Sequence, residues 1–186
     1  VAWRDAGNTI SAVADLKLEQ LVQWRAERLA DAQTIREIRD SVLGLEAHVT
    51  GAMTAAQVES LREWMRSLSR RRGYERVSLV DRAGRPVVSS VEDRHPMDEA
   101  TRRVVAEAIR DGAARLGDVH RAGEREAVRL DVVAPLTSAR PGVGTFGAVV
   151  LELDPRVALF PRLESWPIPS RSGEILLLSF NESVFT

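Results

Sequence analysis

Arg129 and Asp131 interrupt an otherwise apolar stretch and are the first candidates for chemistry in this sequence. Residues 127–136 alternate as a β-strand does, which places Arg129 and Asp131 on one face and an apolar series on the other. An arginine can bind a carboxylate through two parallel hydrogen bonds, and an aspartate can hold an ammonium group or orient that arginine. The same pattern also fits an arginine–aspartate pair on a solvated sheet face, which would contribute little energy.

Three more residues are placed in the candidate ligand site. Ser78 lies on the polar side of a strand expected over residues 74–81, and Arg94 and His95 belong to a polar loop expected to cover the same face of the sheet. A histidine there would make binding depend on pH near neutrality. The five residues suit a small anionic or zwitterionic metabolite bound in a concave, partly polar site.

The sequence gives little support for a catalytic, metal-binding or nucleotide-binding site. The sequence has no cysteine, which excludes disulfides and thiol catalysis. The three histidines, His48, His95 and His120, show no metal-ligand spacing, so each histidine is interpreted as a surface residue. Residues 142–147 match G-x-G-x-x-G but precede an apolar strand instead of opening a helix, so they do not indicate a dinucleotide site. No hydrolase, nucleotide-binding, kinase or cyclase signature occurs, although a triad assembled from distant residues would leave none. We therefore expect neither a cofactor nor an enzyme activity in this chain.

Composition narrows the class of protein further. The 186 residues carry 26 basic and 27 acidic side chains and 44% hydrophobic residues. A net charge of −1 lacks the positive surface of a nucleic-acid-binding protein. No run reaches the roughly 18 apolar residues needed to span a membrane. Because the chain begins at Val1, without methionine or a signal peptide, we expect an excised fragment of a longer protein.

The N-terminal part of the chain is expected to be helical. Apolar residues recur every three or four positions over residues 3–49, notably at Leu18, Val22, Leu29 and Ile35. A helix of this length either projects beyond its domain or pairs with a second copy, which predicts a homodimer through this helix. A second helix begins at the capping box Thr54-Ala-Ala-Gln57 and ends with three arginines and Gly73.

The remainder predicts an antiparallel sheet. Strands are expected at residues 74–81, 87–91, 116–120, 127–136 and 146–153, with a helix over 97–111 between the second and third. A short helix follows the Asp154-Pro155 cap, and an exit strand is expected at 174–178. The fold class is therefore α+β, with two leading helices packed on a five-stranded antiparallel sheet. Its core is expected to include Val77, Leu79, Val128, Leu130, Val132, Val149 and Leu151.

The C-terminal third resembles a known family. The residues that carry the resemblance are Gly147, Asp154, Pro155, Phe160, Pro161, Trp166, Pro167, Pro169, Ser170, Glu174 and Leu176. Their pattern resembles the extracytoplasmic Cache (PAS-like, PDC) sensor domains of bacterial histidine kinases and diguanylate cyclases. The resemblance implies one Cache-like domain over residues 1–178, made of the long helix (1–50) and the second helix with a PAS-like sheet (51–178). Residues 179–186 would then lead toward a downstream module.

The resemblance also implies a function. The chain would be the periplasmic sensing domain of an inner-membrane protein and would relay the state of a small-molecule ligand to a kinase or cyclase output elsewhere in that protein. Cache domains hold their ligand between the sheet and its covering loop and helix, the region predicted above from Arg129 and Asp131. The amino-acid-binding motif of some double-Cache receptors is absent, so ligand class does not carry over. The alternative is a module without a pocket that dimerises through its first helix.

Overall fold

The computed structural model describes residues 2–37, 45–46, 49, 53–92, 97–123, 127–138 and 140–165. Its helices and strands follow one another in the order α1 (Ala2–Glu37), α3 (Ala55–Arg72), β1 (Arg76–Asp81), β2 (Pro86–Ser89), α4 (Glu99–Asp111), β3 (Arg115–Leu116), β4 (His120–Ala122), β5 (Ala127–Thr137), β6 (Thr145–Leu153), α5 (Pro155–Ala158) and α6 (Phe160–Glu164). This order confirms the predicted α+β class. The expected exit strand, the chain ends and Arg94 and His95 lie outside the described residues.

The strands form one antiparallel sheet in the order β2-β1-β6-β5-β3, with β4 also paired to β5. The prediction of a single strand at residues 116–120 is wrong. The chain forms two short strands there, β3 and β4, and β4 continues to Ala122. Gly117 lies between them, and its amide donates to the Asp131 carbonyl oxygen at 2.8 Å. A Cβ at this glycine would lie 2.9 Å from Val104 of α4, so the bend lets the helix approach closely.

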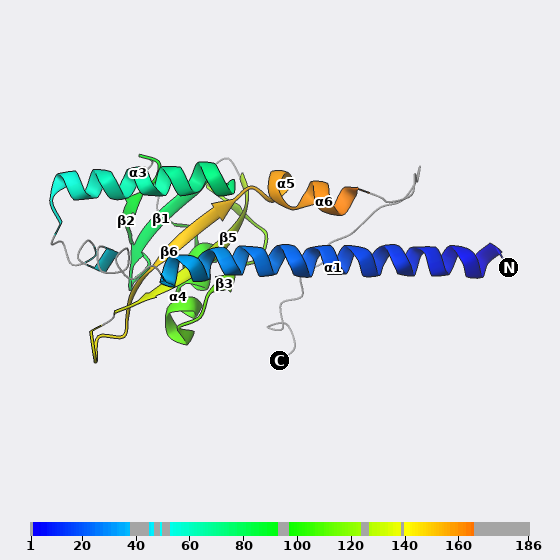
Figure 1. The fold of residues 1–186 in the computed structure, drawn as a ribbon, viewed down its shortest axis with the longest axis horizontal. Helices are drawn as coiled ribbons and strands as arrows, with labels where there is room; N and C mark the ends of the chain where they lie inside the picture. Colours follow the sequence, from blue (N-terminus) through cyan, green and yellow to red (C-terminus); the bar gives the residue numbers. More distant parts are fainter. Residues whose placement is uncertain are drawn as a thin grey trace.

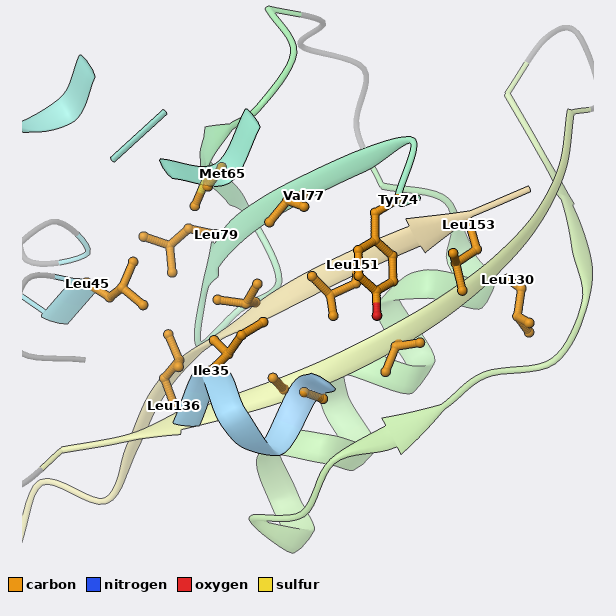
Figure 2. Close-up of a cluster of buried hydrophobic side chains, with 14 of the residues drawn as sticks. Ile35, Leu45, Met65, Tyr74, Val77, Leu79, Leu130, Leu136, Leu151 and Leu153 are labelled. Carbon is orange, nitrogen blue, oxygen red and sulfur yellow. The ribbon is translucent and has the colours of Figure 1, made fainter. Parts of the chain in front are cut away.

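Helices cover both faces of the sheet (Figure 1). On one face α1 and α3 enclose the larger core, where Leu79 and Leu151 of the sheet face the same space as Ile35 and Met65 of the helices (Figure 2). On the other face Val80, Val133, Ala148 and Val150 pack against Val105 and Ala108 of α4. Of the seven predicted core residues six are buried, and Val128 is half-buried beside Arg121 in the short β4–β5 pairing.

The face of α1 that is buried differs from the face expected from its apolar residues. Trp24 and Ile35 are buried, but Leu18 and Val22 are each 59% exposed. The helix instead buries Lys17 and Asp31 in line with Trp24, because those polar groups find partners on the domain. The described helix ends at Glu37, and the expected continuation over 38–44 is outside the described residues. Figure 1 shows its N-terminal half extending well past the sheet.

The predicted helix ends are confirmed. The Thr54 hydroxyl accepts from the Gln57 amide and the Gln57 side chain accepts from the Thr54 amide, which completes the capping box. Gly73 ends α3 at φ 72°, a conformation that favours glycine. Asp154 caps the helix that follows β6, although this helix is divided at Leu159 into α5 and α6. These local signals place the ends of the sheet-covering helices.

A buried hydrogen bond joins α1 to the start of β1. The Tyr74 hydroxyl donates to Asp31 Oδ2 at 2.8 Å, and Arg72 lies 2.9 Å from Asp31 Oδ1. Burial, together with the bond to Asp31, raises the pKa of Tyr74 well above its usual range. The tyrosine therefore remains a neutral donor that anchors the long helix.

Replacing Tyr74 with phenylalanine leaves this buried carboxylate with one bond fewer. We expect Tyr74→Phe to lower the free energy of unfolding in urea by about 1–3 kcal/mol. Ser60→Ala, which removes an exposed hydroxyl from α3, should change it by less than about 0.5 kcal/mol. Equal unfolding free energies for Tyr74→Phe and the parent would contradict this role.

Candidate functional site

Ionisable side chains gather where α4 meets the sheet. We define the charged cluster as Arg76, Asp98, His120, Arg129, Asp131 and Glu152. The strand register creates it, because Glu152 of β6 pairs with Arg76 of β1 on one side and with Asp131 of β5 on the other. On β4, His120 pairs with Arg129. Four strands and the start of α4 thus contribute to one site.

Glu152 holds both arginines of the cluster. Arg129 Nη1 donates to Glu152 Oε2 at 2.7 Å, and Arg76 Nε lies 3.2 Å from Glu152 Oε1. The Glu152 side chain is only 5% exposed. Burial raises its pKa to about 7, although both arginines act in the opposite direction. Glu152 is therefore able to gain or lose a proton near neutral pH.

The first turn of α4 joins the sheet through Thr101. Asp98 caps the helix by accepting from the Thr101 amide at 2.9 Å. The Thr101 hydroxyl lies 2.6 Å from Asp131 Oδ2 and 3.2 Å from Asp98 Oδ2, so both carboxylates share this donor. Asp131 is fully buried, and burial raises its pKa. Burial also opposes ionisation of Asp98, but the Thr101 amide and the charge of His120 outweigh it and lower that pKa.

His120 points an unsatisfied nitrogen at two acids. Its Nδ1 lies 3.0 Å from the Asp118 carbonyl oxygen, and since a carbonyl only accepts, Nδ1 carries the hydrogen. The other nitrogen, Nε2, lies 3.3 Å from Asp98 Oδ2 and 3.6 Å from Asp131 Oδ2. Within the described part of the chain Nε2 has no hydrogen-bond partner, and neither has Asp131 Oδ1. The ring therefore faces the carboxyl groups with the atom that binds a proton.

The structure brings three of the five predicted site residues to this face of the sheet. Arg129 and Asp131 lie together, but Arg129 forms its ion pair with Glu152 and not with the aspartate. The alternative of a solvated arginine–aspartate pair is wrong, because Asp131 is 0% exposed. Ser78 is buried two residues along β1 from Arg76, and its hydroxyl donates to Ser89 at 3.2 Å.

Sequence analysis missed several members of the site. His120 was interpreted as a surface residue, which is wrong because its side chain is 13% exposed and faces the cluster. Glu152 offered a signal, since it is the one ionisable residue in the apolar run 146–153. The spacing of Asp98 and Thr101 matches a helix cap, but the helix was expected to begin at Met97. Neither signal reveals which residues these side chains contact in the folded chain.

Cavities were found elsewhere among the described residues. Open cavities of about 380 Å³ lie beside Gln20 and Trp24 of α1 and beside Leu61 and Trp64 of α3, and one of about 250 Å³ lies between these helices. The charged cluster lines none of the three. Within the described ranges no three histidine or acidic residues are arranged to hold a metal ion. Nor does any helix there have the length and apolarity to cross a membrane.

The raised acid pKa values predict a pH-dependent stability. The folded chain retains protons on Glu152 that the unfolded chain releases above its ordinary pKa of 4.5. This contribution is therefore fully present below about pH 4.5 and is lost as pH rises through about 7. We expect the free energy of unfolding to fall between pH 5 and 8, by on the order of 3 kcal/mol from Glu152.

Urea unfolding at pH 5, 6, 7 and 8 checks this prediction. Glu152→Gln should flatten the profile, while Glu99→Gln, which removes an exposed carboxylate from the first turn of α4, should keep the parent's slope. A Glu152→Gln profile as steep as the parent's would refute the assignment.

Known proteins share this fold without close sequence similarity. No protein-family model and no curated protein matches the chain. The solved sensor domain of the Vibrio cholerae histidine kinase DctB matches with a TM-score of 0.70 and 14% identity over 89% of this chain and 62% of that one. The Escherichia coli DcuS sensor domain matches at 0.56 and 12%, over 77% of this chain and 96% of that one.

A third match is the ligand-binding domain of the Campylobacter jejuni chemoreceptor Tlp3 in complex with 4-methylisoleucine. Its TM-score is 0.60 at 10% identity, over 82% of this chain and 61% of that one. The chain thus spans about three fifths of the DctB and Tlp3 domains. At these identities the likeness concerns the fold. The chain has the fold of bacterial sensor and ligand-binding domains, which confirms, at the level of the fold, its resemblance to the Cache sensor domains.

Proposed function

We propose that this chain is the extracytoplasmic small-molecule sensing domain of a membrane-bound bacterial signalling protein. It would lie in the periplasm, between flanking membrane helices, and relay ligand state to a kinase or cyclase output in the same protein. The observation that carries the proposal is the charged cluster, which lies between the sheet and α4, where the family resemblance implies a ligand pocket. The shared fold with sensor domains supports the same function.

The unsatisfied atoms of the cluster suggest the ligand. Arg129 Nε is buried and has no hydrogen-bond partner among the described residues, so it is a donor for a carboxylate. Asp131 Oδ1 is likewise unpartnered and is an acceptor for an ammonium group. A small zwitterionic metabolite offers both groups, as do the compounds bound by the similar domains of Tlp3 (4-methylisoleucine) and the Pseudomonas aeruginosa chemoreceptor PctC (GABA). Ser78 and the predicted loop residues Arg94 and His95 complete the proposed site.

The relay would pass through α1. Lys17 of this helix is 6% exposed, and its Nζ donates to the Arg162 carbonyl oxygen at 2.6 Å and to Ser165 Oγ at 3.1 Å. The N-terminal helix is thus bound directly to the end of α6. A movement of the sheet would then reach both chain ends together.

A second copy of the chain is the proposed partner of α1. Leu18 and Val22 lie one turn apart on this helix and are each 59% exposed, and Ile10 is 62% exposed farther out. Exposed apolar residues on a helix that extends beyond its domain favour pairing with an identical helix. This surface is also what supports the alternative, a dimerisation module without a ligand.

A thermal-shift screen with amino acids, organic acids and polyamines tests the ligand proposal. A true ligand at 100 times its Kd should stabilise the folded chain by about 2.7 kcal/mol. Arg129→Ala should abolish this response with the circular dichroism spectrum unchanged, and Asp131→Asn provides a second variant. The matched control, Arg102→Gln on α4, removes a half-exposed arginine and should respond as the parent does. Absence of any shift would favour the dimerisation module.

Sedimentation velocity tests the dimer. We expect a monomer–dimer equilibrium, and Leu18→Glu with Val22→Glu should shift it to monomer by placing charges in the apolar contact. Val157→Glu on α5, at a site 77% exposed, is the control and should leave the equilibrium unchanged. A parent chain that is monomeric at high concentration would contradict the proposed pairing.

A further inference from the structure

The charged cluster is not electrically balanced by its own residues. With every carboxyl ionised, Asp98, Asp131 and Glu152 carry three negative charges. The two arginines carry two positive charges, and both lie against Glu152. With a neutral imidazole on His120 the cluster therefore has a net charge of −1, and one bound proton makes it neutral.

Burial makes this imbalance costly. The side chains of Asp131 and Glu152 are 0% and 5% exposed, so water screens their repulsion poorly. They are cross-strand partners in the β5–β6 register, which holds them side by side whatever their charge. Among the described residues, the groups that act most strongly on these two acids come from β1, β4, β5, β6 and the start of α4. They are the other members of the charged cluster and the Thr101 hydroxyl.

Binding positions for a proton are present. Nε2 of His120 carries no hydrogen in the neutral ring, because Nδ1 donates to Asp118, and it faces carboxylate oxygens at 3.3 and 3.6 Å. Without a proton, lone pairs face each other there. A proton placed on Nε2 or on a carboxyl turns this contact into an attraction. The same proton supplies a donor where Asp131 Oδ1 has no partner.

We infer that the charged cluster is a proton-binding site whose occupation holds the first turn of α4 against the sheet, so that alkaline pH releases this turn. The proton is shared between the neighbouring acids Asp131 and Glu152, whose titrations are coupled. Burial raises the pKa of Asp131 and raises that of Glu152 to about 7, which agrees with retention of the proton on this pair. This signal needs no metabolite and is therefore separate from the ligand proposed above.

The first turn of α4 is the part that responds. Asp98 caps it and Thr101 binds Asp131, so the bonds of this turn to the sheet are polar, while Met97 just before the cap packs against the apolar cluster. The strands are held by their ladders, and farther along α4 Val105 and Ala108 pack in an apolar cluster. A buried negative charge is relieved most easily by moving the helix start, which admits water to the carboxyl groups.

Amide hydrogen exchange on the whole 186-residue chain, without ligand, tests the inference. The amides of Thr101 and Arg102 donate to Asp98 and report on the turn. After correction for the intrinsic effect of pH, their protection should fall at least about tenfold from pH 6 to 8.5. Asp131→Asn removes one negative charge and resembles the protonated acid, so protection should stay high at both pH values. Glu152→Gln should do the same.

Controls and direct titration decide the outcome. Glu99→Gln, in the same turn but exposed, should keep the parent's pH dependence. In the parent, NMR of the Asp131 and Glu152 carboxyl carbons should show loss of one proton over this range, even if a variant fails to fold. The inference would be overturned if amide protection of this turn in the parent did not depend on pH, or if it fell equally in Asp131→Asn. A loss of metabolite binding alone would not affect it.

Discussion

The pairing of β5 with β6 is the constraint on which the rest of the structure depends. Its register places Val132 beside Leu151 on the face under α1 and α3, and Asp131 beside Glu152 on the face under α4. Since side chains alternate along a strand, a slip of one residue would exchange the apolar core with the charged cluster. Position 147 also requires glycine, because a Cβ there would lie 2.3 Å from the Val80 carbonyl oxygen of β1. The central strands therefore have one arrangement.

The two faces of the sheet bury different kinds of side chain. The large core under α1 and α3 is apolar, and the buried carboxylates beside it, those of Asp31 and Glu46, are paired. Glu46, for example, accepts from Ser138 at 3.0 Å and from Arg140 Nε at 2.9 Å, and so binds a helical segment to the β5–β6 loop. Under α4, by contrast, ionisable groups are buried with atoms left unpaired. Such a site stabilises a fold poorly, and its cost fits a functional role.

The long helix joins the core to α6. It packs on the sheet through Trp24 and is attached to α6 through Lys17, while its outward residues Leu18 and Val22 remain uncovered. One element thus contacts the core and the end of α6, and it offers a surface to a second copy. The long helix therefore links the core, the end of α6 and the uncovered apolar surface within one rigid element.

The sequence by itself determined the local features. Alternation along residues 127–136 predicted the faces of β5, and the Thr54–Gln57 box, Gly73 and Asp154 predicted helix ends, because each signal acts within a few residues. Together with the order of elements, these signals were sufficient for the α+β class and for placing Arg129 and Asp131 on the face opposite the large core.

Only the tertiary structure decided the partners. Arg129 binds Glu152 and not Asp131, because cross-strand register sets which side chains meet. His120 is half-buried because β4 pairs with β5 and places the ring beside Asp98 at the start of α4. The face that α1 buries depends on partners for Lys17 and Asp31 that lie more than 40 residues away. Such contacts leave no periodic trace in the sequence, since they depend on where distant segments meet.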